Sequence, residues 1–178
     1  MKKLALGLTI ILLFATGVFA QSKTKKPIRK ITRPTSDIRK VDFKNFRYGG
    51  DNLILRNGHQ KYGEGEMDYV DLSSVKYVDF DGDGKEEAFV VLDGSTSGSS
   101  GSYLDVFVFA YRNGSAQQIW RKTNERSSAI LKGRLILFTY PEYVGDDAHC
   151  CPSYATTDTY GWKGSGISQI SKKRKRLK

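Results

Sequence analysis

The sequence has little of what common catalytic centres are built from. Its 178 residues include only two histidines and two cysteines, and no Gly-x-Ser-x-Gly segment occurs. A serine nucleophile needs a base held beside it, and two histidines leave few ways to supply one. The serine-rich stretch at residues 93–102 is therefore interpreted as a mobile loop and not as a nucleophile site.

Long apolar runs are also scarce. The longest, residues 4–14, is shorter than the roughly 20 residues that a membrane-spanning helix needs. Lys2 and Lys3 precede it, and Val18-Phe19-Ala20 follows with the small-residue pattern of a cleavage site, which together predict a secretory signal peptide at residues 1–20. We expect a secreted or periplasmic protein that starts near Gln21, with no transmembrane segment in the mature chain.

The two cysteines, Cys150 and Cys151, are neighbours in the stretch "GDDAHCCPSY". In an oxidising compartment they could close only an eight-membered ring, which strains the peptide between them and makes the bridge labile. A vicinal disulfide is the favoured interpretation. Two buried thiols, or bridges to another chain, are the alternatives, and His149 beside them is interpreted as an ordinary loop histidine.

Positive charge is concentrated near the two ends of the chain. The formal net charge is +10, but residues 22–40 hold eight Lys or Arg against one Asp, and residues 171–178 hold six against none. The body, residues 41–170, is left with a net charge of −5. We predict a disordered basic arm at 21–40, a single domain at 41–170 and a basic tail at 171–178.

The basic segments suggest a partner of opposite charge. Anionic cell-envelope polymers or lipid headgroups would attract them through screened, salt-sensitive forces. Export argues against nucleic acid as the partner. A solvated tail that only aids solubility is the alternative.

No window of the sequence shows a helical period over twelve residues. From Val41 onward, short β-prone runs alternate with turn residues, and Asn57-Gly58, Asn113-Gly114 and Lys132-Gly133 have the composition of tight hairpin turns. We predict an all-β fold with little helix, an antiparallel sandwich or rolled meander of about eight to ten short strands. The expected strands are 41–48, 52–56, 75–80, 88–92, 103–111, 117–122, 128–131, 134–140, 156–162 and 166–170.

One of these runs, "YLDVFVFAY" at residues 103–111, alternates without a polar face. One side carries aliphatic residues, and the other carries four aromatic residues with Asp105 among them. Such a strand is expected to lie centrally, covered on both sides.

The segment "DFDGDGKEE" is the clearest candidate for a binding site. Carboxylates of Asp79, Asp81 and Asp83 stand at loop positions 1, 3 and 5, the carbonyl of Lys85 stands at position 7, and Glu87 stands at position 9. Calcium takes six to eight such oxygens. Position 12 is Val90 where an EF-hand has Glu, so the pattern favours a calcium loop followed directly by a strand. The alternative is an Asp-Gly turn whose aspartates only cap backbone amides.

The body resembles a family of small exported bacterial proteins, the LppP/LprE lipoprotein type. The resemblance rests on the early Asp-Gly loop and on the late Cys-Cys-Pro-Ser followed by Tyr-Gly-Trp. It covers roughly residues 41–162 and implies an exported domain, with no catalytic residue to transfer. The family's lipid-bearing cysteine is missing at the N-terminus, so membrane anchoring is not implied.

Three functions are consistent with these features. The first is an exported, non-catalytic binding or envelope-associated module with a structural calcium loop. The second is a secreted hydrolase that uses acidic residues, with His149 as a further candidate. The third is a redox-responsive protein that acts through Cys150 and Cys151.

Overall fold

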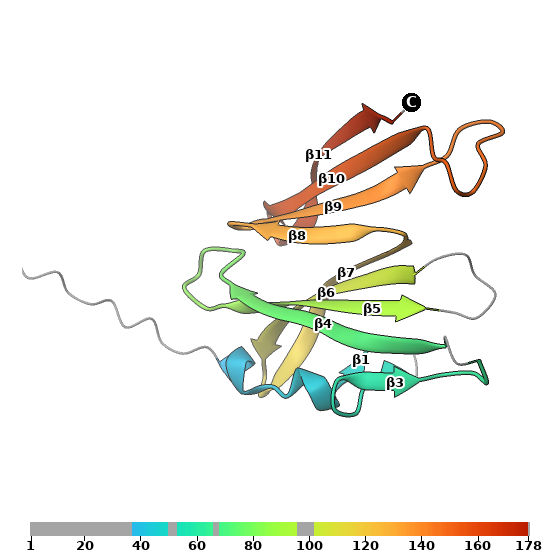
Figure 1. Ribbon diagram of the computed structural model, residues 1–178. Helices are drawn as coiled ribbons and strands as arrows, with labels where there is room; N and C mark the ends of the chain where they lie inside the picture. The colour runs from blue at the N-terminus through green and yellow to red at the C-terminus, as the bar shows by residue number, and fades with distance from the viewer. Residues whose placement is uncertain (1–36, 50–52, 66–67, 96–101, 178) are drawn as a thin grey trace, which may run out of the picture. The chain divides into compact units, whose positions relative to one another are not determined.

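The computed structural model describes residues 37–49, 53–65, 68–95 and 102–177, which belong to one compact unit (Figure 1). The predicted signal peptide, most of the basic arm and the centre of the serine-rich loop lie outside these residues. The described part forms two short 3₁₀ helices and eleven strands. They are η1 Asp37–Lys40, η2 Phe43–Asn45, β1 Arg47–Tyr48, β2 Leu53–Ile54, β3 His59–Lys61, β4 Tyr69–Val78, β5 Glu87–Ser95, β6 Ser102–Arg112, β7 Ser115–Glu125, β8 Ser128–Lys132, β9 Leu135–Glu142, β10 Tyr154–Lys163 and β11 Gly166–Arg176.

The strands form two larger antiparallel sheets and one small one. The first sheet has the order β3-β4-β5-β6-β7, the second has the order β11-β10-β9-β8, and β1 pairs with β2 alone. Within each larger sheet, strands that are consecutive in sequence are hydrogen-bonded neighbours (Figure 1). The predicted all-β, antiparallel fold is confirmed, although several strands are longer than expected.

Two apolar clusters cover the two faces of the five-stranded sheet. On one face, Val106 and Val108 of β6 pack with Ile136 and Phe138 of the four-stranded sheet. On the other face, aromatic residues of β6 pack with Ile38 and other residues from the N-terminal segment. Strand β6 is therefore buried on both sides, as its alternation of aliphatic and aromatic residues predicted.

Tight turns occur at all three predicted places, but at the third Lys132 pairs with Leu135, so the turn residues are Gly133 and Arg134 and not Lys132 and Gly133. Asn113 and Gly114 have positive φ angles of 53° and 81° and join β6 to β7. Glycines at positive φ also occur at positions 58 and 133. Two-residue turns of this kind match the right-handed twist of the strands they join, which is why the sequence reveals them.

Both ends of the predicted domain differ from the structure. The ordered body begins before Val41, because η1 lies at residues 37–40 and Ile38 is fully buried. The predicted basic tail is in large part a strand: β11 continues to Arg176, which pairs with Tyr154 of β10. Residues 172–176 are all Lys or Arg and all exposed. On an edge strand such side chains can stay in water while their backbone completes the ladder, so charge alone did not mark the end of the domain.

Two stretches adopt a local structure that differs from the prediction. Residues 41–48 were expected to form one strand, but Asp42 accepts hydrogen bonds from the Lys44 amide at 3.0 Å and from the Asn45 side chain at 2.7 Å and caps a 3₁₀ helix. Such local side-chain bonds compete with strand pairing. Strands β3 and the first half of β4 were not predicted. No helix in the described ranges is both long and apolar enough to cross a bilayer.

Candidate functional site

The predicted calcium segment is the connection between β4 and β5, whose ends pair at Val78 and Glu87. Phe80, at the start of this connection, is 2% exposed and belongs to the apolar cluster between the two larger sheets. The buried side chain of Phe80 therefore anchors the loop in the apolar core between the two larger sheets.

The aspartates of the loop hold its backbone in a tight curl. Asp79 accepts hydrogen bonds from the amides of Gly82 at 2.6 Å and Gly84 at 3.2 Å. Asp81 accepts one from the Asp83 amide at 2.9 Å, and Asp83 accepts one from the Lys85 amide at 2.7 Å. Both glycines have positive φ, 84° and 90°, which a residue with a Cβ rarely adopts. These are the amide caps that the alternative turn interpretation predicts.

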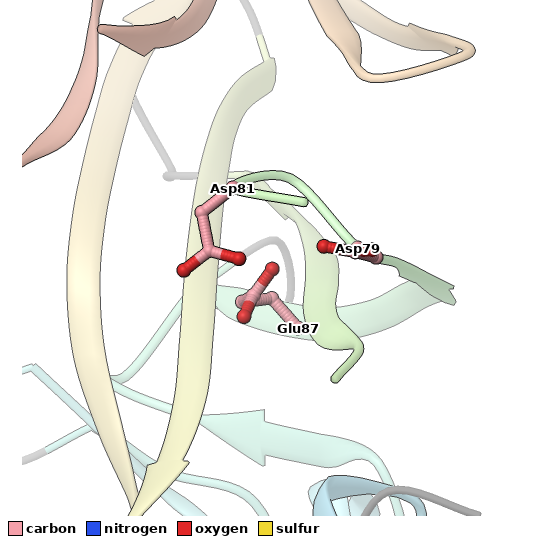
Figure 2. A group of neighbouring side chains, drawn as sticks. All are labelled: Asp79, Asp81 and Glu87. Carbon is pink, nitrogen blue, oxygen red and sulfur yellow. The ribbon is translucent and has the colours of Figure 1, made fainter. Parts of the chain in front are cut away.

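Three of the five predicted ligand residues also converge. One carboxylate oxygen from each of Asp79, Asp81 and Glu87 lies within 4.8 Å of the other two, and Figure 2 shows the three carboxylates turned toward one another. In the described residues this is the one group of three or more His, Cys, Asp or Glu close enough to share an ion. Asp83 lies outside the group, and its carboxylate accepts a hydrogen bond from the Lys85 amide.

Glu87 has the most unusual environment of the three. Its side chain is 5% exposed, and its Oε2 accepts a hydrogen bond from the Phe80 amide at 2.8 Å. Burial raises the pKa of Glu87 to about 7, the nearby aspartates add to the increase, and the Phe80 amide opposes it. The site therefore contains a carboxyl group that gives up its proton only near neutral pH unless a cation is present.

Two arginines, which sequence reasoning did not find, lie against the loop. Arg134 from the β8–β9 turn donates to Asp79 at 3.1 Å. Arg39 of η1 makes two bonds to Glu86, at 2.5 and 2.9 Å, and its guanidinium lies 4.5 Å from the centre of the Tyr77 ring. The loop thus joins the N-terminal segment to both larger sheets. Two of its carboxylates face an arginine, and one of these, Asp79, belongs to the converging group of three.

The cysteines lie in the connection between β9 and β10. Asp147 organises this connection by accepting bonds from the amides of Val144 at 2.9 Å and Ser153 at 2.8 Å. The carbonyl of His149 accepts bonds from Arg126 and from Tyr143. Cys150 and Cys151 are exposed, so the alternative of two buried thiols is not what the structure shows.

The vicinal disulfide remains a prediction, and it can be measured by thiol counting. Protein isolated without reductant is expected to show no reactive thiol, and two after mild reduction, because a strained bridge at an exposed turn is easily reduced. A Cys150→Ser/Cys151→Ser variant is the blank. Two reactive thiols in the untreated protein would contradict the bridge.

Comparison with known proteins found no family model, curated protein or solved structure that matches the chain. The resemblance to the LppP/LprE lipoprotein type therefore stays a prediction that rests on its motifs alone.

Proposed function

We propose that this protein is an exported, non-catalytic binding or envelope-associated module whose Asp79–Glu87 loop holds a structural calcium ion. The observation that supports the ion most directly is the convergence of Asp79, Asp81 and Glu87 within 4.8 Å. Three carboxylates at this distance repel one another, and a hard divalent cation relieves the repulsion with the oxygen ligands that it prefers.

A structural role fits the position of the loop better than a signalling role. The loop is fixed by buried Phe80, by the Arg134 contact and by the Arg39–Glu86 pair. An ion bound there would stabilise a junction between layers that these contacts already form. Extracellular calcium modules with this kind of role bind with dissociation constants of about 10⁻⁴ to 10⁻³ M.

A hydrolase that uses the acidic residues is the second candidate, and only the raised pKa of Glu87 favours it. The two histidines, which are the usual bases, are engaged elsewhere. His59 lies 2.7 Å from Asp71 across β3 and β4, and the ring of His149 stacks on Tyr143. Neither histidine belongs to the carboxylate group, so the binding module is the better supported of the two.

Calcium should raise the melting temperature of the purified protein. With a dissociation constant in the range above, about 10 mM calcium contributes roughly 1.5 to 3 kcal/mol by mass action, or about 4 to 8 °C for a domain of this size. Asp81→Asn should remove most of this increase, because it withdraws one charged ligand. The measurement is a thermal melt in EDTA, in graded calcium and in graded magnesium.

The matched control is Asp93→Asn, which removes the same charge from an exposed position of β5 outside the carboxylate group. Its melting temperature should still increase with calcium, as that of the wild type does. A wild-type melt that is the same in EDTA and in calcium would leave the loop as an Asp-Gly turn and would remove the calcium proposal.

A further inference from the structure

The four-stranded sheet has one face that no described part of the molecule covers. Its inner face carries Ile136, Phe138 and Tyr160, which pack in the cluster between the sheets. Successive side chains of a strand point to opposite faces, so the residues at the alternate positions form a second face. We call this the outer face of the sheet.

Apolar side chains cross the outer face from edge to edge. Ile130 of β8 is 57% exposed and lies opposite Leu137 of β9, and Ile170 of β11 is 49% exposed. Leu135 and Ile170 approach the Cβ position of Gly161 to 3.0 and 3.5 Å, so they meet over β10, where this glycine leaves room for them. Apolar side chains of β8, β9 and β11 thus form one strip that crosses β10 at Gly161, with Ile130 and Ile170 exposed and Leu135 and Leu137 half-buried.

Four lysines flank this strip. By register and alternation, Lys132, Lys163, Lys173 and Lys175 belong to the outer face, and Lys173 and Lys175 stand opposite Thr157 and Ala155. None of these four lysines forms an ion pair with another described residue.

The acidic residues of the same sheet are on its other side. Asp158 is buried and accepts hydrogen bonds from Tyr140 and Tyr160, and Glu142 pairs with Arg174 at 2.7 Å. No outward position of β8 to β11 holds Asp or Glu. Residues 41–170 have a net charge of −5. The outer face carries Lys132 and Lys163 within that range and Lys173 and Lys175 after it, so it is a separate positive surface.

We propose that the outer face docks on the surface of an anionic lipid bilayer. A bilayer engages both features at once, since lysines meet anionic headgroups while isoleucines enter the boundary between headgroups and acyl chains. A soluble polyanion would use the lysines and leave Ile130 and Ile170 in water. A second copy of the chain would bring the same lysines against one another. The inference rests on the envelope association proposed above and names its surface and its partner.

The test is co-sedimentation of residues 21–178, the predicted mature chain, with vesicles of phosphatidylglycerol and phosphatidylcholine, in EDTA so that calcium cannot bridge protein and lipid. Lys173→Gln/Lys175→Gln should weaken binding about 25-fold, at about fivefold for each lysine. Ile130→Ser/Ile170→Ser should weaken the binding that remains at raised salt, where the lysines are screened, by about fivefold for each isoleucine relative to the wild type. All these side chains are exposed, so the melting temperatures should stay near that of the wild type.

The matched control is Lys61→Gln/Lys76→Gln, which removes two charges from the five-stranded sheet and should bind like the wild type. Every variant keeps the basic segment at residues 21–40, so a difference between variants reports on the sheet. Equal binding by the outer-face and control variants would overturn the proposal. So would binding only to long-chain polyphosphate, or equal binding to vesicles of phosphatidylcholine alone. The calcium melt is independent of these outcomes, so failure of one proposal is distinguishable from failure of the other.

Discussion

Arg121→Met is expected to destabilise the protein by about 3 to 5 kcal/mol at pH 8, one of the two largest effects that the structure predicts. Asp105 is 2% exposed in the middle of β6. Arg121 of β7 holds it with bonds of 3.0 Å and 2.6 Å, and the same guanidinium lies 5.1 Å from the centre of the Phe107 ring. Without the arginine, a carboxylate stays buried with its main counter-charge gone. Equilibrium unfolding in urea measures the loss.

Two further measurements distinguish a buried charge from a lost apolar contact. The difference in stability between the wild type and Arg121→Met, measured at the same pH, should be smaller at pH 5 than at pH 8, because a protonated Asp105 carries no charge. The double variant Asp105→Leu/Arg121→Leu should lie much closer to the wild type, since no charge is left unpaired. Lys76→Met, at an exposed position of the same sheet, should change stability by less than about 0.5 kcal/mol. An Arg121→Met loss that is independent of pH would show that packing, and not charge, is responsible.

The Asp105–Arg121 pair also shows where sequence reasoning stops. The alternation of residues 103–111 predicted a strand covered on both faces, and the Asn113-Gly114 turn predicted its hairpin with β7. Counting back from that turn without interruption would place Asp105 opposite Lys122. A register shift between Val108 and Phe109 moves Thr123 opposite Asp105 instead, and thereby brings Arg121 onto the same face. A one-residue register shift moves the side chains of a strand to the opposite face, and the sequence of β7 does not indicate where the shift occurs.

Only the local part of the acidic loop could be predicted from the sequence. Positive φ at Gly82 and Gly84 and the curl of the aspartates follow from neighbours in sequence, so a local pattern could reveal them. The Arg134 contact joins residues 55 positions apart, and the Arg39 contact joins residues 47 apart. Contacts of this range depend on how the layers pack, which the pattern of a single segment does not contain.

The outer face of the four-stranded sheet could not be predicted either, because it depends on how distant strands pair. Charge counting separated the last eight residues from the body, whereas Lys173 and Lys175 continue a face that begins with Lys132 in β8. Only the pairing of β11 with β10 places these lysines beside Ile170 and the other apolar side chains. A basic segment in sequence thus becomes one edge of an ordered surface.

The second large effect concerns pH. The folded protein raises the pKa of Glu87 from its ordinary value of 4.5 to about 7. Between these values the unfolded chain has released its proton while the folded protein still holds it, so raising the pH favours unfolding. In EDTA we expect stability to fall by about 3 kcal/mol from pH 4.5 to pH 8 through this group. Urea unfolding across the range measures the change, and Glu87→Gln, which has no proton to release, should lack it.

Calcium should stabilise the folded protein more strongly as the pH rises, because the ion binds only the ionised form of the same carboxyl group and must displace its proton. The apparent calcium affinity of the wild type should therefore increase about tenfold between pH 6 and pH 8, as the ionised fraction of a group with a pKa near 7 does. Glu87→Gln should be more stable than the wild type at pH 8 in EDTA and should gain little from calcium. Glu125→Gln, at an exposed position of β7, is the matched control and should follow the wild type in both respects. If calcium affinity did not change with pH while the EDTA stability curve of the wild type did, Glu87 would be a buried acid that takes no part in binding the ion.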